Sequence, residues 1–248
     1  MSNNITYEHP INERTRILLK LEYLFNHITF ENTLETLTNI LQIGEISKRF
    51  DLRFECLQSL DRILTNLIQI KTGSFDINLN KLEQTKQNVE KQINILKSGK
   101  GKFGEYIIKN EPLHHIISKL NAPGGLITGD IPYLKFWFQK PYEEQQKELM
   151  TLHQEFIPLQ NAVITISQFI KSSATPQKAI SQNGTYSKML DNNKLQLIRI
   201  SLNKNINAYP EISGNGKFIS IRFMTKEQLK DKPNISYTPI EFDISYCF

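Results

Sequence analysis

Residues 240–246, Ile-Glu-Phe-Asp-Ile-Ser-Tyr, alternate apolar and polar side chains near the end of the chain. This period of two places one row of side chains against a core and the other toward solvent, as in a half-buried β-strand. Residues 17–28, Ile-Leu-Leu-Lys-Leu-Glu-Tyr-Leu-Phe-Asn-His-Ile, instead repeat apolar side chains three and four apart, which indicates an amphipathic helix. The period changes near Pro176, so the sequence predicts an α+β fold.

The chain before Pro176 reads as a series of helices that pack as an antiparallel bundle. Asn32 and Glu35 form an N-terminal capping pattern, and Asp130-Ile131-Pro132 reads as a helix start with Asp130 as the cap. The glycine-rich residues 123–125, Pro-Gly-Gly, are expected to reverse the chain between two helices. We expect helices at about residues 12–28, from 32 onward, 54–68 ending before Gly73, 79–96, 106–120, 130–138, 142–153 and 154–173.

The chain after Pro176 reads as an antiparallel β-sheet, smaller than the helical part. Residues 4–8 are also extended and can join this sheet as an N-terminal strand. The sequence therefore predicts an α-helical domain at residues 1–175 and a β-strand domain at residues 176–248. The expected strands are residues 177–180, 195–202, 217–224 and 239–247, separated by turns such as Asn183-Gly184 and Gly214-Asn215-Gly216.

Length and composition favour a folded protein of the cytoplasm. The chain has 248 residues, of which 39% are hydrophobic, so it can bury a sizeable core. No run of about 18 apolar residues is present, and the first ten residues lack the basic and apolar parts of a signal peptide. We therefore expect no direct membrane insertion. Cys56 and Cys247 have no metal-ligand spacing and are expected to be reduced and structural.

The net charge of +5 is distributed unevenly along the chain. Residues 176–248 carry 10 basic and 6 acidic side chains, whereas residues 1–175 carry 20 and 19. Such an excess can attract an acidic protein segment, a nucleic acid or an anionic membrane, or it can be an ordinary solvated surface. Charge alone does not choose between these partners.

No residue pattern in the sequence indicates a catalytic site or a cofactor-binding site. The adjacent His114 and His115 diverge by about 100° on a helix, so they cannot face one metal ion together. Residues 213–217, Ser-Gly-Asn-Gly-Lys, lack the spacing of a phosphate-binding loop and precede a strand, which favours a hairpin turn. Residues 123–125 lack the lysine and hydroxyl that hold a nucleotide and magnesium. The sequence predicts no enzyme, no metal and no cofactor.

Five short motifs occur in order along nearly the whole chain. They are residues 7–13 (YEHPINE), residues 123–125 (PGG) with Asp130, Pro132 and Trp137, residues 183–186 (NGTY), residues 209–214 (YPEISG) and residues 221–224 (IRFM). Together these motifs resemble the ZapD family of cell-division proteins. The resemblance implies a non-enzymatic homodimer with a helical and a β domain. It also implies binding to the C-terminal tail of the tubulin-like protein FtsZ, so that the dimer crosslinks and bundles FtsZ protofilaments at the mid-cell division site.

For tail binding, the basic residues of the helical part are the candidates, because a short flexible segment is expected to use an apolar groove together with charge contacts. Lys20 lies at a position where the resemblance implies a basic residue, and Lys135 lies inside the motif from Asp130 to Trp137. Arg16 and Lys119 can extend this patch if the helices pack side by side. Related proteins can carry arginine where this chain has Lys20, and lysine lacks the planar fork of arginine, so the salt dependence can differ.

Two other function classes stay open from the residues alone. A basic nucleic-acid-binding regulator is the main alternative, because basic and aromatic residues can pair phosphate contacts with base stacking. No zinc-finger, RNA-recognition or basic-zipper signature is present, and core packing explains most aromatic residues. A small-molecule enzyme is the more distant alternative. We expect no nucleic acid among the partners.

Overall fold

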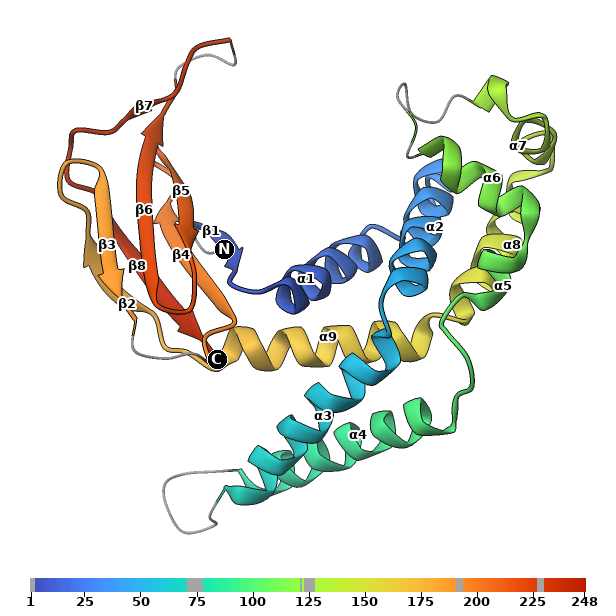
Figure 1. The fold of residues 1–248 in the computed structure, drawn as a ribbon, viewed down its shortest axis with the longest axis horizontal. Coiled ribbons are helices and arrows are strands. Elements are labelled where there is room, and N and C mark those ends of the chain that lie inside the picture. Colours follow the sequence, from blue (N-terminus) through green and yellow to red (C-terminus); the bar gives the residue numbers. More distant parts are fainter. Residues whose placement is uncertain (1–2, 71–77, 121, 123–127, 191–193, 227–229) are drawn as a thin grey trace. The chain divides into compact units, whose positions relative to one another are not determined.

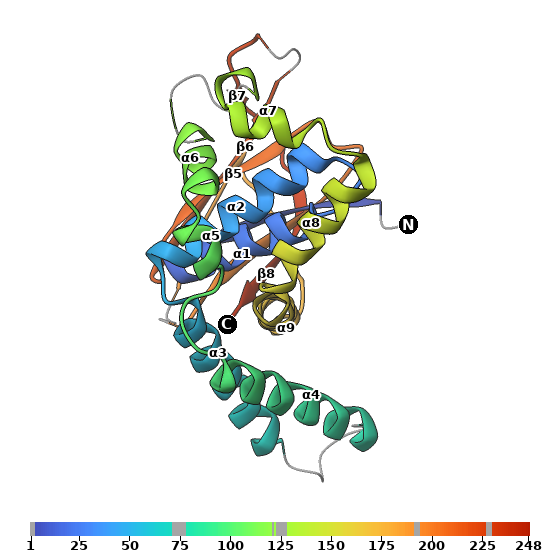
Figure 2. The ribbon, with the colours of Figure 1, turned by 90° about the vertical axis from the view of Figure 1, so that its right-hand side faces the viewer.

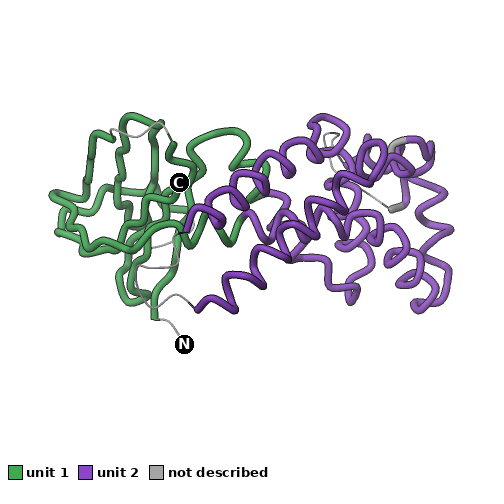
Figure 3. The backbone as a smooth tube through the Cα atoms, turned by 90° about the horizontal axis from the view of Figure 1, so that it is seen from below, with its two compact units in different colours: residues 1–19, 167–248 green, residues 20–166 purple. Residues whose placement is uncertain are grey.

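The computed structural model describes residues 3–70, 78–120, 122, 128–190, 194–226 and 230–248, and the chain divides into two units (Figure 3). Unit 1 comprises residues 1–19 and 167–248, and unit 2 comprises residues 20–166. The expected helix end at Gly73 and the expected chain reversal at residues 123–125 lie outside the described residues. The predicted domain boundary after residue 175 stays a prediction.

Unit 1 contains two antiparallel sheets, each built from four strands of its described part (Figure 1). The first sheet has the order β1-β4-β8-β2, and the second has the order β3-β6-β5, with β7 paired to the end of β6. The strands are β1 (Asn4–Pro10), β2 (Gln177–Ile180), β3 (Thr185–Met189), β4 (Leu197–Asn203), β5 (Tyr209–Gly214), β6 (Phe218–Thr225), β7 (Asn234–Ile235) and β8 (Glu241–Cys247).

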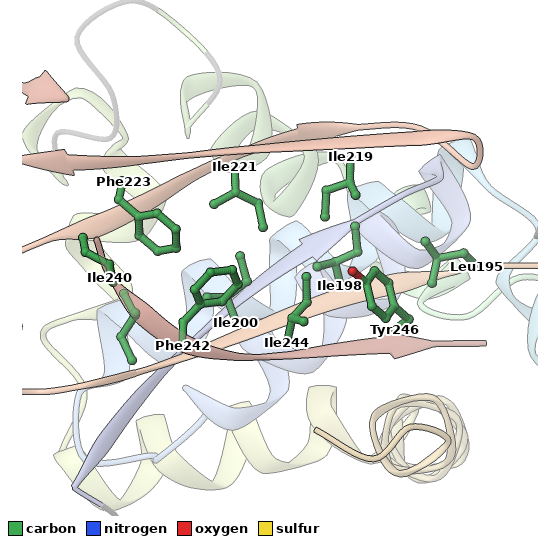
Figure 4. Packing of buried hydrophobic residues seen from close by; sticks show 11 residues of the cluster. Leu195, Ile198, Ile200, Ile219, Ile221, Phe223, Ile240, Phe242, Ile244 and Tyr246 are labelled. Atoms are coloured by element: carbon green, nitrogen blue, oxygen red, sulfur yellow. The ribbon is translucent and has the colours of Figure 1, made fainter. Parts of the chain in front are cut away.

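The core of unit 1 lies between the inner faces of these two sheets (Figure 4). Phe242 and Ile244 from β8 lie opposite Phe223 and Ile221 from β6, and all four side chains are buried. The rings of Phe223 and Phe242 are 4.9 Å apart between centroids. The alternation that predicts the last strand therefore also orients its apolar row, since every second side chain of a strand points to the same face.

The predicted strands at residues 177–180, 195–202, 217–224 and 239–247 are present as β2, β4, β6 and β8, and the N-terminal strand joins β4 through a register that pairs Tyr7 with Ile200. The strands divide between two sheets rather than forming one, because β2 pairs with β8 whereas β3 pairs with β6. Strands β3, β5 and β7 are not among the strands that the sequence predicts. Pro210 lies in β5, where it is tolerated because β5 is an edge strand.

Unit 2 contains the helices, and their positions agree with the periodicity of the sequence, which confirms the α+β fold. Two of the helices, α1 and α9, also include residues of unit 1. The helices are α1 (Glu13–Asn26), α2 (Thr33–Arg49), α3 (Leu52–Gln69), α4 (Leu79–Ser98), α5 (Glu105–Lys109), α6 (Glu111–Leu120), α7 (Pro132–Trp137), α8 (Tyr142–Gln154) and α9 (Ile157–Ser172), together with the short 3₁₀ helix η1 (Thr128–Asp130).

Helix termini follow the predicted capping pattern at one site and depart from it at another. The side chain of Asn32 accepts a hydrogen bond from the Glu35 N–H at the start of α2, as the capping pattern predicts. The prediction that Asp130 caps the next helix is wrong, because Asp130 ends η1 and Ile131 is the cap residue of α7. No side chain caps α7, which begins with Pro132 as expected.

Helix α2 lies at the centre of one part of unit 2, where it contacts α5, α6 and α8 (Figures 1 and 2). The Tyr142 hydroxyl and the Gln146 Nε2 of α8 donate to the Phe30 carbonyl, at 3.0 and 2.9 Å, just before α2. Helices α3 and α4 form a separate hairpin and lie side by side in both views. The first group of helices positions the pocket described next.

Candidate partner-binding surface

Helices α2, α5, α6, α7 and α8 surround a pocket of about 420 Å³ in unit 2. Its floor is apolar, since Leu37, Leu134 and Leu149 are buried at 4%, 1% and 0% exposure. Its rim includes two exposed aromatic side chains, Tyr106 at 56% and Tyr133 at 45%. A concave apolar surface with aromatic edges is suited to an aliphatic or aromatic side chain of a bound segment.

A polar network holds one wall of this pocket in place. The Trp137 Nε1 donates to the Glu148 Oε2 at 2.7 Å, and the Lys140 Nζ lies 2.5 Å from the Glu148 Oε1. The hydrogen bond from Lys140 is the main cause that lowers the pKa of Glu148, and the bond from Trp137 adds to it. Glu148 therefore stays charged near neutral pH and fixes the indole ring against the pocket.

None of the four basic residues that the sequence predicts for partner binding lines this pocket. Lys135 is exposed on α7, next to the pocket residues Tyr133 and Leu134, and Lys119 is half-buried in the last turn of α6. Their helices, α6 and α7, both contribute residues to the pocket lining. Their role in partner binding stays a prediction.

Lys20 lies on a different helix, α1, and is exposed. Its Nζ is 5.5 Å from the centroid of the Tyr23 ring, and Tyr23 is 4.0 Å from the His27 ring between centroids. These three residues form a stripe at positions three and four apart, which is the spacing of one helix face. Lys20 on α1 and Lys135 on α7 therefore lie on two different helices.

Arg16 belongs to unit 1, whereas Lys20, Lys119 and Lys135 belong to unit 2. Its side chain is exposed and lies 3.7 Å from the Glu13 carboxylate one turn earlier in α1. An exposed pair of this kind is weak and leaves the guanidinium accessible. A partner-binding role for Arg16 stays a prediction as well.

The pocket itself is a feature that the sequence does not reveal. Leu134, Phe136 and Trp137 have the apolar character of core residues, and Leu134 and Trp137 are indeed buried. Phe136 is also apolar but is 63% exposed. The available signal is the clustering of Tyr133, Phe136 and Trp137 in one short helix, since a helix of six residues cannot bury every face.

The structure shows no cluster of metal-ligating side chains within its described ranges. No three side chains of His, Cys, Asp or Glu gather there as metal ligands, and His114 instead lies 3.3 Å from the Lys48 ammonium through its Nε2. Among the same residues, no helix is both long and apolar enough to cross a lipid bilayer. Within the described residues of unit 2, the pocket and the exposed basic residues are the candidates for partner binding.

Comparisons with known proteins assign the chain to a family. A family model described as ZapD, cell division protein, matches residues 17–222. A curated cell division protein ZapD of Dechloromonas aromatica (strain RCB) is 29% identical over 250 residues, covering 98% of this chain and 99% of that protein. Proteins of the same name from Azoarcus sp. (strain BH72) and Aromatoleum aromaticum are each 28% identical to this chain over 250 residues. Both alignments cover 98% of this chain, and they cover 99% and 97% of the two relatives, respectively. The chain therefore belongs to the ZapD family of cell division proteins.

Proposed function

We propose that this protein binds the C-terminal tail of FtsZ through unit 2 and, as a homodimer, crosslinks FtsZ protofilaments into bundles. Membership of a family of cell division proteins supports a role in division. The resemblance described above implies FtsZ as the partner. Such a protein acts in the cytoplasm and is recruited to the division site at mid-cell.

The observation that carries the tail-binding step is the pocket with its aromatic rim. Tyr106 and Tyr133 are large and exposed, although burial would remove much of their apolar surface from water. An apolar side chain of a flexible segment that enters the pocket gives this burial without a change in the fold. Aromatic residues at the edge of a desolvated pocket are frequent hot spots of protein recognition.

Basic side chains next to the pocket contribute selection by charge. Lys135 is adjacent in sequence to pocket residues, and no carboxylate among the described residues forms an ion pair with it. Exposed charges of this kind raise the association rate with an oppositely charged segment and make binding sensitive to salt. Lys20 offers a second cation on α1.

Dimerisation converts this weak contact into bundling. Once one subunit holds a tail, the second subunit meets neighbouring tails at a high effective concentration, so modest single affinities give firm crosslinks. Sedimentation equilibrium is expected to show dimers at tens of micromolar. A protein that is only monomeric at this concentration would have no means of crosslinking.

Low-speed pelleting of FtsZ with GTP tests the whole proposal, because only bundles sediment at low force. Addition of this protein is expected to increase the pelleted fraction of intact FtsZ and to leave FtsZ without its C-terminal tail in the supernatant. Equal pelleting of both forms would contradict tail-directed binding. A gel shift on duplex and single-stranded DNA at moderate salt tests the alternative, and clear retention at sub-micromolar protein would favour a nucleic-acid-binding regulator.

A further inference from the structure

Strand β3 in unit 1 has one edge that no other strand of the described residues covers. It pairs with β6 on one side, in a register that sets Tyr186 opposite Ile221 and Lys188 opposite Ile219. The Leu190 N–H donates to the Lys217 carbonyl and the Phe223 N–H donates to the Gly184 carbonyl, at 2.7 and 2.8 Å. Even-numbered residues of β3 therefore direct their main-chain groups toward β6.

The odd-numbered residues direct theirs the other way. Thr185 uses its outward groups in a tight turn with Gln182, through hydrogen bonds of 2.9 and 3.0 Å. Ser187 and Met189 come next, and both are exposed. Within the described part of the chain, nothing bonds to the N–H or the C=O of these two residues. The edge thus offers two donors and two acceptors at the spacing of an antiparallel or parallel partner strand.

The core-facing side of this edge carries one positive charge, the ammonium group of Lys188. The Lys188 side chain points to the same face as Tyr186, and its Nζ lies 4.8 Å from the centroid of the Tyr246 ring. No carboxylate in the described residues forms an ion pair with Lys188. An inward charge at a sheet edge makes the addition of a neutral strand costly, because the ammonium would lose water without gaining a partner. A strand with a carboxylate at the facing position avoids this cost.

Space for such a carboxylate is present beside Lys188. A hollow of about 490 Å³ is lined by Lys188, Met189 and Tyr246, by Thr175 from the connection between α9 and β2, and by Gln177 at the start of β2. The hydroxyl, amide and ammonium groups can all bond to a carboxylate. The outer side of the edge is apolar instead, since Met189 is 71% exposed and lies opposite Phe218, which is 39% exposed.

We propose that the free edge of β3 binds an extended segment of a partner protein in which acidic and apolar residues alternate. The segment adds as a further strand on Ser187 and Met189, its carboxylates face Lys188 and the hollow, and its apolar side chains pack on Met189 and Phe218. Lys188 selects against neutral and basic strands by charge. This site lies in unit 1 and does not depend on the tail-binding proposal for unit 2.

The test uses the full chain and two fluorescein-labelled peptides of nine residues, one alternating Glu and Val and the other alternating Lys and Val. Fluorescence anisotropy is expected to show saturable binding of the Glu-Val peptide and no binding of the Lys-Val peptide. The charge-swapped variant Lys188→Glu is expected to reverse this preference. Equal binding of both peptides, or none of the Glu-Val peptide up to millimolar concentration, would overturn the proposal.

A pair of variants at one position tests the strand geometry. Ser187→Pro removes the outward N–H but breaks no hydrogen bond to β6. It is expected to lower the affinity for the Glu-Val peptide by about tenfold or more. Ser187→Ala keeps the N–H and is expected to bind as the unchanged protein does. Unweakened binding by Ser187→Pro would contradict strand addition. If Ser187→Pro does not fold, hydrogen exchange of the Ser187 and Met189 amides in the unchanged protein decides, because strand addition must slow both and binding elsewhere slows neither.

Discussion

The two units use their large apolar residues in different ways. In unit 1 the alternating side chains of β6 and β8 meet between two sheets, and Phe223, Ile221 and Ile244 are almost completely buried. In unit 2 the helices bury Leu37 and Leu149 but leave Tyr106 and Tyr133 at the rim of a pocket. The geometry of a sheet explains why its apolar row is buried, whereas the aromatic residues left exposed on short helices are candidates for partner binding.

The largest effect is expected from the core of unit 1. Phe223→Ala removes a fully buried ring that packs on Phe242, and it is expected to lower the free energy of unfolding by about 3–5 kcal/mol. Urea unfolding monitored by circular dichroism measures this change. Tyr237→Ala is the matched control, because Tyr237 is 84% exposed and its loss is expected to change stability by less than about 0.5 kcal/mol. A change in the free energy of unfolding as small as that of Tyr237→Ala would contradict the tightly packed core described for unit 1.

The next effect concerns function rather than stability. The double variant Tyr106→Ala and Tyr133→Ala is expected to keep its unfolding free energy within about 1 kcal/mol, because both rings are largely exposed. Loss of the rim is expected to cost about 1–2 kcal/mol of tail binding and to reduce FtsZ pelleting at limiting protein. Pelleting by the double variant that matches Tyr237→Ala would assign the exposed rings no role in recognition.

Charge reversal on the surface of unit 2 is expected to act more weakly. Lys20→Glu and Lys135→Glu are each expected to cost about 0.5–1 kcal/mol of tail binding at low salt, and less at high salt. Lys91→Glu is the control, since Lys91 is exposed on α4, away from both positions in sequence. Titration of the FtsZ tail peptide at low and high ionic strength measures the loss of affinity in each variant. An equal loss in all three would mean that net charge, and not position, matters.

The smallest effect concerns the pH dependence of the pocket wall. The hydrogen bond from Lys140 lowers the folded-state pKa of Glu148, so this carboxylate stabilises the fold above the ordinary glutamate pKa. The contribution is lost as pH falls through the lowered folded-state value. Glu148→Gln is therefore expected to be slightly less stable than the unchanged protein at neutral pH, with a gap that closes in acid. Thermal melting across this pH range measures the gap, and a constant gap would contradict the assignment.

Much of the fold is predictable from local periodicity, and the failures have identifiable causes. The helical spacing of residues 17–28 and the alternation of residues 240–246 predict α1 and β8 because the period follows directly from backbone geometry. Strand β5 is not predicted because a proline such as Pro210 usually interrupts a strand. An edge strand tolerates proline, because the missing N–H can face away from the neighbouring strand. The division of the strands into two sheets depends on long-range pairing, which no local pattern contains.

The candidate site is less predictable than the fold. Lys20 and Lys135 can be identified as basic residues on helices, but the pocket arises only when five helices meet. Local sequence does not distinguish the exposed Phe136 from the buried Trp137, because both satisfy a helical apolar pattern. The network of Trp137, Lys140 and Glu148 likewise joins two helices across a turn and has no sequence signature.

The most direct test of the central claim is a titration of a labelled FtsZ C-terminal tail peptide against three forms of the protein, followed by fluorescence anisotropy. The forms are the unchanged chain, Tyr133→Ala in unit 2 and Ser187→Pro in unit 1. We predict that Tyr133→Ala lowers the affinity for the tail peptide by about tenfold, whereas Ser187→Pro leaves this affinity unchanged. Full affinity in Tyr133→Ala together with a loss in Ser187→Pro would contradict the account and would assign the tail to the β-sheet unit.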